Sequence, residues 1–313
     1  MKNWVSYQNG NYFVRLNTEN GTKIRENDLD FFDAEFPESA DVKITNKCTN
    51  PCGNGANCAF CHEGSCPTGK QSDALHSPVW ESFHPYSEIA LGGGNVLEYP
   101  DLIPLLKRLK SLNLIANITV HQNHFEHNFD LIKKLSDEKL IYGLGVSLDK
   151  VTPEFIDKMK QFPNGVIHVI NGIVTGVQLM ALANNGLKIL ILGYKTVRRG
   201  NKLYHSNVGY AIDKRKTLLY NQLEKILKEN WFKVVSFDNL AIKQLKPQRL
   251  VSEEYWNTCF MGDDGIDGHQ TSASMYIDLV ENEFARNSCD VDHRFKIEDK
   301  TVTEMYQFLK RMK

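Results

Sequence analysis

The sequence predicts an α/β fold built from repeated strand–helix units. From about residue 40 onward, short apolar runs alternate with segments in which apolar residues recur three and four positions apart. Strands that are separated by helices favour parallel pairing. Six or seven such units favour a partial or full (β/α) barrel over an open sheet, and 313 residues with 42% hydrophobic content supply a large core.

The first forty residues differ from this pattern and predict an antiparallel hairpin. Strand-like runs cover 4–8, 11–17 and 22–25, and Asn-Gly pairs separate them. Asn9-Gly10 and Asn20-Gly21 accommodate the positive φ angles of tight turns. We therefore expect residues 1–39 to form an N-terminal β-hairpin extension.

Residues 40–245 hold the alternating units and form the expected barrel. The apolar runs predict strands at 41–46, 87–92, 115–121, 141–148, 165–171, 187–193 and 233–238. Apolar side chains at helical spacing predict helices around 102–109, 131–135, 155–159, 177–182 and 219–227. Gly186 follows the fourth of these segments and is typical of a helix stop.

Residues 246–313 predict a smaller C-terminal extension that packs on the barrel. Two strand-like runs, 272–280 and 283–289, flank a short acidic turn and indicate an antiparallel hairpin. Asp263-Asp264-Gly265 lacks the spaced oxygens and the terminal Glu of an EF-hand, so we interpret it as a turn. A last helix is expected from about residue 303 to residue 313.

Charge and cysteine content narrow the classes of function. The net charge of −1 and the pI near 6.8 lack the basic excess of a protein that binds a long stretch of nucleic acid. The longest apolar stretch is too interrupted for a membrane span, and the first residues lack the apolar core of a signal peptide. Seven cysteines, most of them in one loop, indicate metal chemistry in a reducing compartment. We expect a cytoplasmic protein without a membrane partner.

The cysteines gather in a Gly- and Asn-rich loop directly after the first predicted barrel strand. This loop contains Cys48, Cys52, Cys58 and Cys61. Three thiolates at a strand end can hold an iron–sulfur cluster and leave one iron open. Cys58-Ala-Phe-Cys61, with Cys48 before it, resembles the cluster loop of the radical S-adenosylmethionine (SAM) enzymes, whose usual pattern is C-x3-C-x-aromatic-C.

The loop departs from that pattern, because nine residues rather than three separate Cys48 from Cys58. The resemblance favours Cys48, Cys58 and Cys61 as ligands of a [4Fe-4S] cluster, since Cys48 directly follows the strand and Phe60 occupies the aromatic position near the adenine of SAM. The set Cys52, Cys58 and Cys61 is an alternative. A structural zinc site is another, because several nearby cysteines suit a closed tetrahedral site.

A glycine run after the next predicted strand strengthens the resemblance. Gly92-Gly93-Gly94-Asn95 is similar to the family's glycine-rich motif at the end of the second barrel strand, where the backbone meets the methionine amino group of SAM. Glycine permits positive φ angles and close approach of a ligand to the backbone. Asn95 stands where many members have Glu. A glycine run alone is usually a turn, but a zinc loop would predict nothing about these distant glycines.

Polar residues at strand ends are the next candidates, because (β/α) barrels place their working residues there. Strands three to six are followed by Asn123, Ser147, Asn171 and Tyr194, in that order. The resemblance implies that these residues contact SAM, with Ser147 and Asn171 at its ribose and carboxylate and Tyr194 beside its adenine. The structural alternative for Ser and Asn is an ordinary helix cap. His168, inside an apolar strand, is expected to be a core residue.

A basic run after the sixth strand nominates a substrate anchor. Lys195, Arg198 and Arg199 would face the barrel mouth, and guanidinium groups bind carboxylates and phosphates well. A solvated loop is the alternative. Cys259 and Cys289 lie far from the cysteine loop and are candidate catalytic residues that could donate a hydrogen atom to a substrate radical, although free cysteine is commonly a small buried hydrophobe.

The resemblance implies a radical SAM enzyme whose partial (β/α)6-type barrel covers roughly residues 40–245. Such an enzyme reductively cleaves SAM at a [4Fe-4S] cluster to a 5′-deoxyadenosyl radical, takes its electron from a donor such as flavodoxin or ferredoxin, and abstracts hydrogen from a substrate. The absence of a basic surplus and of a region for a second cluster favours a small anionic or nucleotide-like substrate. A peptide or protein substrate is the alternative. A non-enzymatic zinc-binding interaction module is a third hypothesis.

Overall fold

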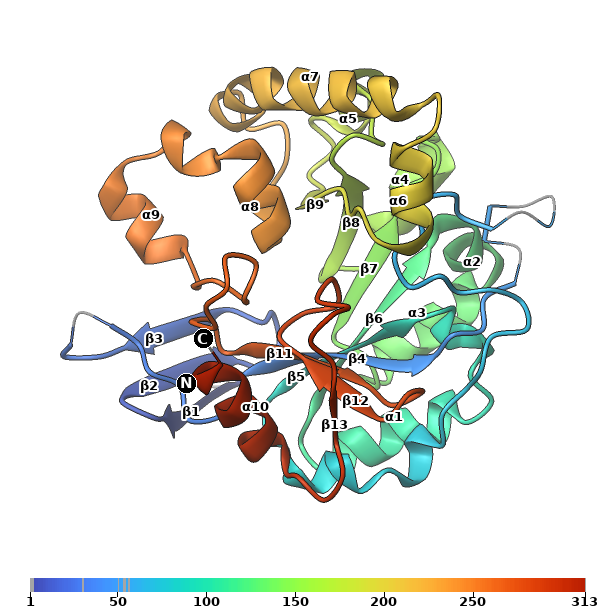
Figure 1. Ribbon diagram of the computed structural model, residues 1–313. Helices are drawn as coiled ribbons and strands as arrows, with labels where there is room; N and C mark the ends of the chain where they lie inside the picture. The colour runs from blue at the N-terminus through green and yellow to red at the C-terminus, as the bar shows by residue number, and fades with distance from the viewer. Residues whose placement is uncertain (1–2, 30, 50, 53–54, 56, 313) are drawn as a thin grey trace.

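A ten-stranded mixed sheet with helices packed against it forms the centre of the protein in the computed structural model, which describes residues 3–29, 31–49, 51–52, 55 and 57–312 (Figure 1). Seven strands follow one another in chain order and pair in parallel. They are β4 (Ser39–Thr45), β5 (Glu88–Gly93), β6 (Ile115–His121), β7 (Gly143–Ser147), β8 (Gly165–Ile170), β9 (Lys188–Leu192) and β10 (Val234–Phe237). All seven strands predicted from the sequence are confirmed.

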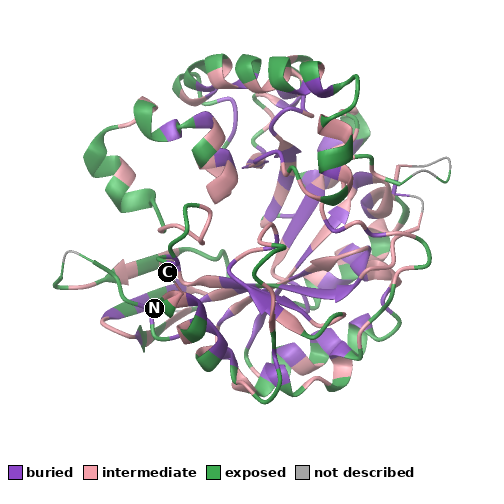
Figure 2. Cartoon of the chain, viewed as in Figure 1, coloured by how far each residue is buried: buried purple, intermediate pink, exposed green. Residues whose placement is uncertain are grey.

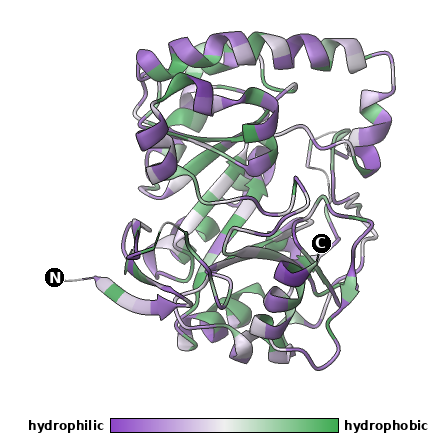
Figure 3. Cartoon of the chain, turned by 60° about the vertical axis from the view of Figure 1, so that its left-hand side comes forward, coloured by the Kyte–Doolittle hydropathy of each residue, from purple (hydrophilic) through white to green (hydrophobic). Residues whose placement is uncertain are grey.

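The helices predicted from apolar residues at helical spacing are also confirmed. They are α1 (Leu102–Ser111), α3 (Phe129–Asp137), α4 (Pro153–Met159), α5 (Gly176–Leu182) and α7 (Gly209–Lys228). One face of each strand packs with these helices, as Ala40, Val42 and Ile44 of β4 do in the common core. Figure 2 shows this burial along the strands, and Figure 3 shows apolar residues concentrated in the same strands. We call the opposite face, which carries Asp41 and Lys43 of β4, the inner face.

Short helices at strand ends did not follow from the sequence. They are α2 (Gln122–His127), α6 (Arg198–Tyr204), α8 (Asn239–Leu245) and α9 (Glu253–Cys259). Each has six or seven residues. The sequences of α2 and α6 hold few apolar residues, so no helical period marks them. Two of them, α2 and α6, carry the side chains of Asn123 and Arg199 to the cysteine loop.

The N-terminal segment forms a separate three-stranded antiparallel sheet of β1 (Trp4–Asn9), β2 (Tyr12–Asn17) and β3 (Lys23–Glu26), as the Asn-Gly turns predicted. Gly10 has φ of 59°, and a Cβ there would lie 1.9 Å from the Asp33 carbonyl oxygen. Buried Glu38 joins this sheet to β4, because it accepts a 2.6 Å hydrogen bond from the Tyr12 hydroxyl and pairs with Lys23 and Arg25.

The C-terminal segment extends the main sheet. The predicted hairpin is confirmed as β11 (Ser274–Asp278) paired with β12 (Glu283–Ala285), which pairs in turn with β13 (Phe295–Lys296). The sequence did not predict that β11 lies parallel to β4. This pairing places C-terminal residues beside β4, the strand that leads into the cysteine loop. The last helix, α10 (Val302–Arg311), is confirmed. None of the described helices is long and apolar enough to cross a membrane.

Candidate functional site

The two sequence motifs meet at the carboxyl ends of β4 and β5. The backbone N–H of Gly94 donates to the Thr45 carbonyl at 2.7 Å, and the N–H of Asn95 donates to the Lys47 carbonyl at 2.8 Å. A Cβ on Gly94 would lie 2.0 Å from the Lys47 oxygen, so this approach requires glycine. A Cβ on Gly92 would meet no protein atom within 4 Å. The glycine run therefore supports the start of the cysteine loop and leaves space above Gly92.

The thiols of the loop lie close to one another. The Sγ atoms of Cys52 and Cys58 are 3.5 Å apart, and Cys61 and Cys48 are also electrostatic neighbours of Cys58. Burial, with the nearby Glu98 carboxylate and Cys61 adding to it, raises the pKa of Cys48 to about 12. Burial also raises the pKa of Cys58. The metal-free thiols of Cys48 and Cys58 are therefore protonated near pH 7, and a metal that binds them must displace their protons.

Hydrogen bonds hold both ends of the cysteine loop. The N–H of Cys48 donates to the Cys66 carbonyl at 2.9 Å, and the Cys66 N–H donates to the Asn46 carbonyl at 3.1 Å. Oε1 of Glu98 accepts from the Thr49 N–H at 3.0 Å and from the Thr49 hydroxyl at 2.8 Å. The Sγ of Cys66 lies 3.6 Å from the Thr68 hydroxyl. The backbone N–H and carbonyl of Cys66, rather than its thiol, make the hydrogen bonds that close the loop.

Asn95 and Asn123, two of the predicted SAM contacts, bond to the loop region itself. Asn95 is buried, and its Nδ2 donates to Glu98 Oε1 at 2.9 Å while its Oδ1 accepts from the Leu97 N–H. The Nδ2 of Asn123 donates to the Pro51 carbonyl at 3.0 Å. In this structure both amides position the segment that carries the cysteines.

The two arginines of the basic run also contact the cysteine loop. Nε of Arg199 donates to the Cys58 carbonyl at 3.0 Å, and its terminal nitrogen donates to the Ser65 carbonyl at 2.8 Å. Arg198 donates to the carbonyls of His62 and Glu63, both at 3.1 Å. The backbone of Arg198, at the start of α6, has a positive φ of 46°, which is uncommon for a residue other than glycine. In this conformation its side chain makes both contacts. In Figure 1 the loop after β4 passes between α2 and α6.

A buried ion-pair network fixes the far end of the loop to the sheet. Glu63 lies 3.2 Å from Lys43 Nζ and 3.4 Å from Arg198, and it accepts a 3.3 Å hydrogen bond from the Tyr276 hydroxyl. Lys43 also pairs with Asp278 at 3.1 Å. Burial opposes ionisation of Glu63, but His62, Lys43 and Arg198 outweigh it, so the pKa of this carboxyl is below its usual value.

Two histidines lie beside the thiols, His121 at the end of β6 and His124 in α2. His121 shares a group with Cys52 and Cys58 whose ligand atoms all fall within 4.8 Å of one another. His124 Nε2 is 3.8 Å from the Cys48 Sγ. Burial lowers the pKa of both histidines, which favours neutral imidazole. Sequence reasoning assigned these histidines no role, although a His-x-x-His run after a strand near the cysteine strand was the available signal.

The other predicted SAM contacts differ in their surroundings. Ser147 ends β7 and is half-buried. Asn171 is fully buried after β8, where its Nδ2 donates to Gln244 Oε1 at 2.9 Å and its Oδ1 has no hydrogen-bond partner among the described residues. The Tyr194 hydroxyl donates to the Gly200 carbonyl at 2.8 Å, and its ring is buried beside Tyr204. Asn171 thus offers a free acceptor, whereas Tyr194 packs against α6.

Lys195 and Cys289 come together near the inner face. Lys195 Nζ donates to the Ser288 hydroxyl at 3.0 Å, and Cys289, Asp238 and Asp41 are among its electrostatic neighbours. Burial raises the pKa of the Cys289 thiol, and Lys195 opposes that shift. The other candidate, Cys259, is exposed on α9 and does not belong to this group.

His168 lies against Gly145 on the inner face. A Cβ on Gly145 would lie 2.4 Å from the imidazole Cε1. Burial, with Lys195 adding to it, lowers the pKa of His168 to about 4. The predicted core residue is therefore half-buried, neutral and directed across the strands.

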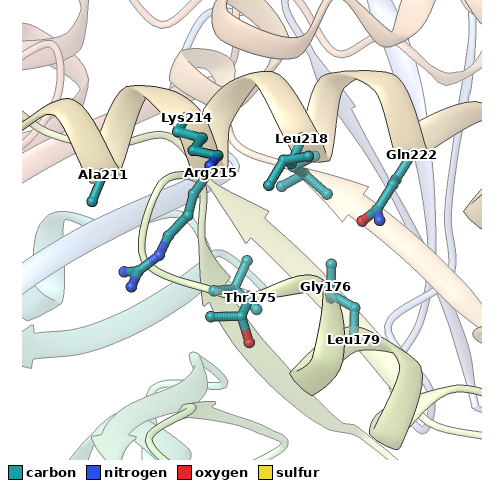
Figure 4. A pocket seen from close by; sticks show the side chains of 10 residues that line it. Thr175, Gly176, Leu179, Ala211, Lys214, Arg215, Leu218 and Gln222 are labelled. Carbon is teal, nitrogen blue, oxygen red and sulfur yellow. The ribbon is translucent and has the colours of Figure 1, made fainter.

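A cavity of about 240 Å³ lies away from these residues, between α5 and α7 (Figure 4). Apolar side chains such as Leu179 and Leu218 line it together with Thr175, Arg215 and Gln222. Its lining contains no cysteine and no carboxylate side chain. We assign no chemistry to this cavity, because neither the thiols nor the glycine run contribute to its lining.

Comparison with solved structures identifies the fold. No protein-family model matches the sequence, and no curated protein matches it. The structure of Streptococcus suis SuiB bound to S-adenosylmethionine has a TM-score of 0.61 at 12% identity, over 99% of this chain and 90% of that chain. SuiB bound to precursor peptide SuiA has a TM-score of 0.60 at 12% identity, over 99% and 88%. At this identity the likeness shows a common fold, and it confirms the α/β fold that the alternating strands and helices predicted.

Proposed function

We propose that this protein is a radical SAM enzyme, with a [4Fe-4S] cluster on the loop after β4 and SAM beside the glycine run after β5. One observation carries the proposal: the two motifs, separated in sequence, are joined by the backbone hydrogen bonds of Gly94 and Asn95 to the start of the loop. The shared fold with SuiB supports it. We also propose that β4–β10 form the partial (β/α) barrel of this family, with residues 1–39 and 246–313 as extensions.

The donor set fits an iron–sulfur cluster. Cys48, Cys58 and Cys61 are mutual neighbours, and iron–sulfur clusters take thiolate ligands. The backbone of Cys48 is fixed directly after β4 by its bond to Cys66, which supports the choice of Cys48 over Cys52. Arg199 lies close enough to favour the ionised form of Cys48. The alternative set with Cys52 stays open, because Cys52 lies in the same loop and is an electrostatic neighbour of both Cys48 and Cys58.

The surroundings also fit SAM. Space above Gly92 admits a ligand to the backbone, and the unpaired Oδ1 of Asn171 is a buried acceptor that a polar ligand atom would satisfy. When bound, the cluster and SAM supply a 5′-deoxyadenosyl radical that abstracts hydrogen from a substrate. The protein's part is to bind SAM at Gly92 and Asn171, to fix the loop through Glu98, Asn123 and Arg199, and to aim the substrate.

The substrate would enter along the inner face, where Lys195 and Cys289 meet. Arg198 and Arg199 hold the cysteine loop, which leaves Lys195 as the cation of the basic run that faces this space. A carboxylate on a small anionic metabolite fits this lysine. A carboxylate on a peptide fits it equally, and the likeness to a SuiB structure with a bound precursor peptide favours a peptide as the second candidate.

The test begins with anaerobic, chelator-treated protein reconstituted with iron and sulfide. The proposal requires about four irons per chain and formation of 5′-deoxyadenosine after addition of dithionite and SAM. Cys48→Ala should abolish the product, and Cys52→Ala should retain it. Loss with Cys52→Ala alone would reverse the ligand assignment. Colourless protein that holds zinc after reconstitution and does not cleave SAM would refute the proposal that this protein is a radical SAM enzyme.

A further inference from the structure

Three metal-binding side chains converge next to the proposed cluster ligands. The Sγ atoms of Cys52 and Cys58 and an imidazole nitrogen of His121 all lie within 4.8 Å of one another, and the two sulfurs are 3.5 Å apart. Among the described residues this is the one group of three or more such donors at this spacing. The proposed cluster set contains Cys58, whereas Cys52 and His121 have no part in it.

The geometry suits a single divalent ion. Sulfurs bound to tetrahedral zinc at about 2.3 Å lie roughly 3.8 Å apart, close to the separation of Cys52 and Cys58. Two thiolates and one imidazole are a common zinc donor set, with water in the fourth position. All three side chains are half-buried, which leaves a path for the ion.

The protein holds these three residues in place by bonds on both sides. Asn123, two residues after His121, donates to the carbonyl of Pro51, the residue before Cys52. Arg199 fixes the carbonyl of Cys58 at 3.0 Å. His121 Nδ1 accepts a 3.2 Å hydrogen bond from the Asn123 N–H, so Nε2 is the nitrogen left for a metal. Metal binding there would move the imidazole proton to Nδ1 and release this bond.

We propose that the cluster-free protein binds one Zn²⁺ through Cys52, Cys58 and His121, and that zinc and the [4Fe-4S] cluster exclude each other because both use Cys58. Each thiol releases one proton to solvent when zinc binds, and no electron is transferred. The exclusion rests on the proposed function, whereas the zinc site itself does not. Cys52, which the family pattern leaves without a role, thereby acquires one.

The experiment titrates chelator-treated, cluster-free, full-length protein with Co²⁺, a spectroscopic substitute for zinc. We expect one equivalent to give thiolate charge-transfer and tetrahedral visible absorption, and Zn²⁺ to displace it. Cys52→Ser and His121→Ala should each weaken Co²⁺ binding at least about tenfold. The matched controls Cys61→Ser and His124→Ala should retain the signal, because neither residue belongs to the group.

Competition tests the shared ligand. Zn²⁺ added before iron and sulfide should reduce cluster assembly in the native protein, and should have at least about tenfold less effect in His121→Ala, which keeps all four loop cysteines. Co²⁺ binding that persists in both Cys52→Ser and His121→Ala, or that is lost equally in Cys61→Ser, would overturn the site. Failure of the native protein to assemble a cluster without zinc would refute the proposed function instead, while the Co²⁺ titration would still decide the zinc site.

Discussion

Nε of Arg199 donates a hydrogen bond to the carbonyl oxygen of Cys58 at 3.0 Å, across 141 positions of sequence. This bond, with that of the same side chain to Ser65, ties the start of α6 to the middle of the cysteine loop. A basic residue that sequence reasoning nominated as a substrate anchor thus contacts the protein's own backbone. The loop is held from β4, from α2 and from α6 at once, as a site for a preorganised cluster requires.

Replacement of Arg199 should loosen the loop. Arg199→Lys keeps the positive charge, but a lysine cannot donate to both carbonyls as the guanidinium does. We therefore expect the free energy that holds the loop in this conformation to fall by about 1–3 kcal/mol. Iron should be lost several-fold faster from reconstituted protein during gel filtration, and the cluster's electron paramagnetic resonance signal should broaden. Lys202→Ala, an exposed cation on the same helix, is the control and should match the native protein. Equal iron retention in both variants would contradict the positioning role.

The Lys43 ammonium should be important for stability. Lys43→Met removes the cation paired with buried Asp278 and one of the two cations paired with buried Glu63, which keeps Arg198. Removing one partner of a buried ion pair costs about 3–5 kcal/mol. Denaturant unfolding should show this loss. Lys296→Met removes the more exposed pair with Glu283 and should change the free energy of unfolding by less than about 1 kcal/mol. Equal changes in the free energy of unfolding for the two substitutions would refute the predicted contribution of the buried ion-pair network to stability.

Gly92 and Gly94 should respond differently to the same added methyl group. Gly94→Ala places a Cβ 2.0 Å from the Lys47 carbonyl oxygen, so it should lower the unfolding temperature and disturb the cysteine loop. Gly92→Ala meets no protein atom within 4 Å and should leave the unfolding temperature unchanged. It should nevertheless weaken SAM binding by about tenfold or more, measured by calorimetry on reconstituted protein, because the methyl group fills the proposed ligand space. Unchanged SAM affinity in Gly92→Ala would place the cofactor elsewhere.

His168 should make the protein less stable in acid. Its folded pKa of about 4 lies below the unfolded value of 6.5, so the unfolded chain binds the proton first. The free energy of unfolding should therefore fall as the pH decreases from about 6.5 to about 4. The pKa of Asp264, raised by burial to about 6, acts in the opposite direction over an overlapping range. Unfolding of His168→Gln at several pH values should show a shallower acid decline than the native protein, and an identical decline would count against this assignment.

Replacement of Cys289 and replacement of Cys259 should have different effects on product formation. Cys289 neighbours Lys195 and lies near the proposed substrate path, whereas Cys259 is exposed on α9. Once a substrate is found, Cys289→Ala should lower product formation while SAM cleavage continues, because the thiol would act after hydrogen abstraction. Cys259→Ala should behave as the native protein. Full product formation in Cys289→Ala would remove this thiol from the mechanism.

Sequence patterns predicted regular elements better than side-chain partners. The strands from β4 to β9 followed from apolar runs because their helix-facing residues are buried in one core, against which β10 packs its partly buried Val235 and Phe237. The short helices α2 and α6 escaped prediction because they hold few apolar residues, whereas the similarly short α4 and α5 carry apolar residues at helical spacing. Those helices carry Asn123 and Arg199, which hold the cysteine loop. Because the helices were not predicted, these contacts were not predicted either.

The sequence by itself determined the α/β fold, the cysteine loop after the first parallel strand and the glycine run after the second. These features depend on local periodicity, turn chemistry and spacing along the chain. Only the tertiary structure decided that Arg199 binds the loop, that β11 lies beside β4, and that His121 joins Cys52 and Cys58. The physical reason is that hydrogen bonds and metal-ligand distances between remote residues depend on packing of the whole chain, which no local pattern encodes.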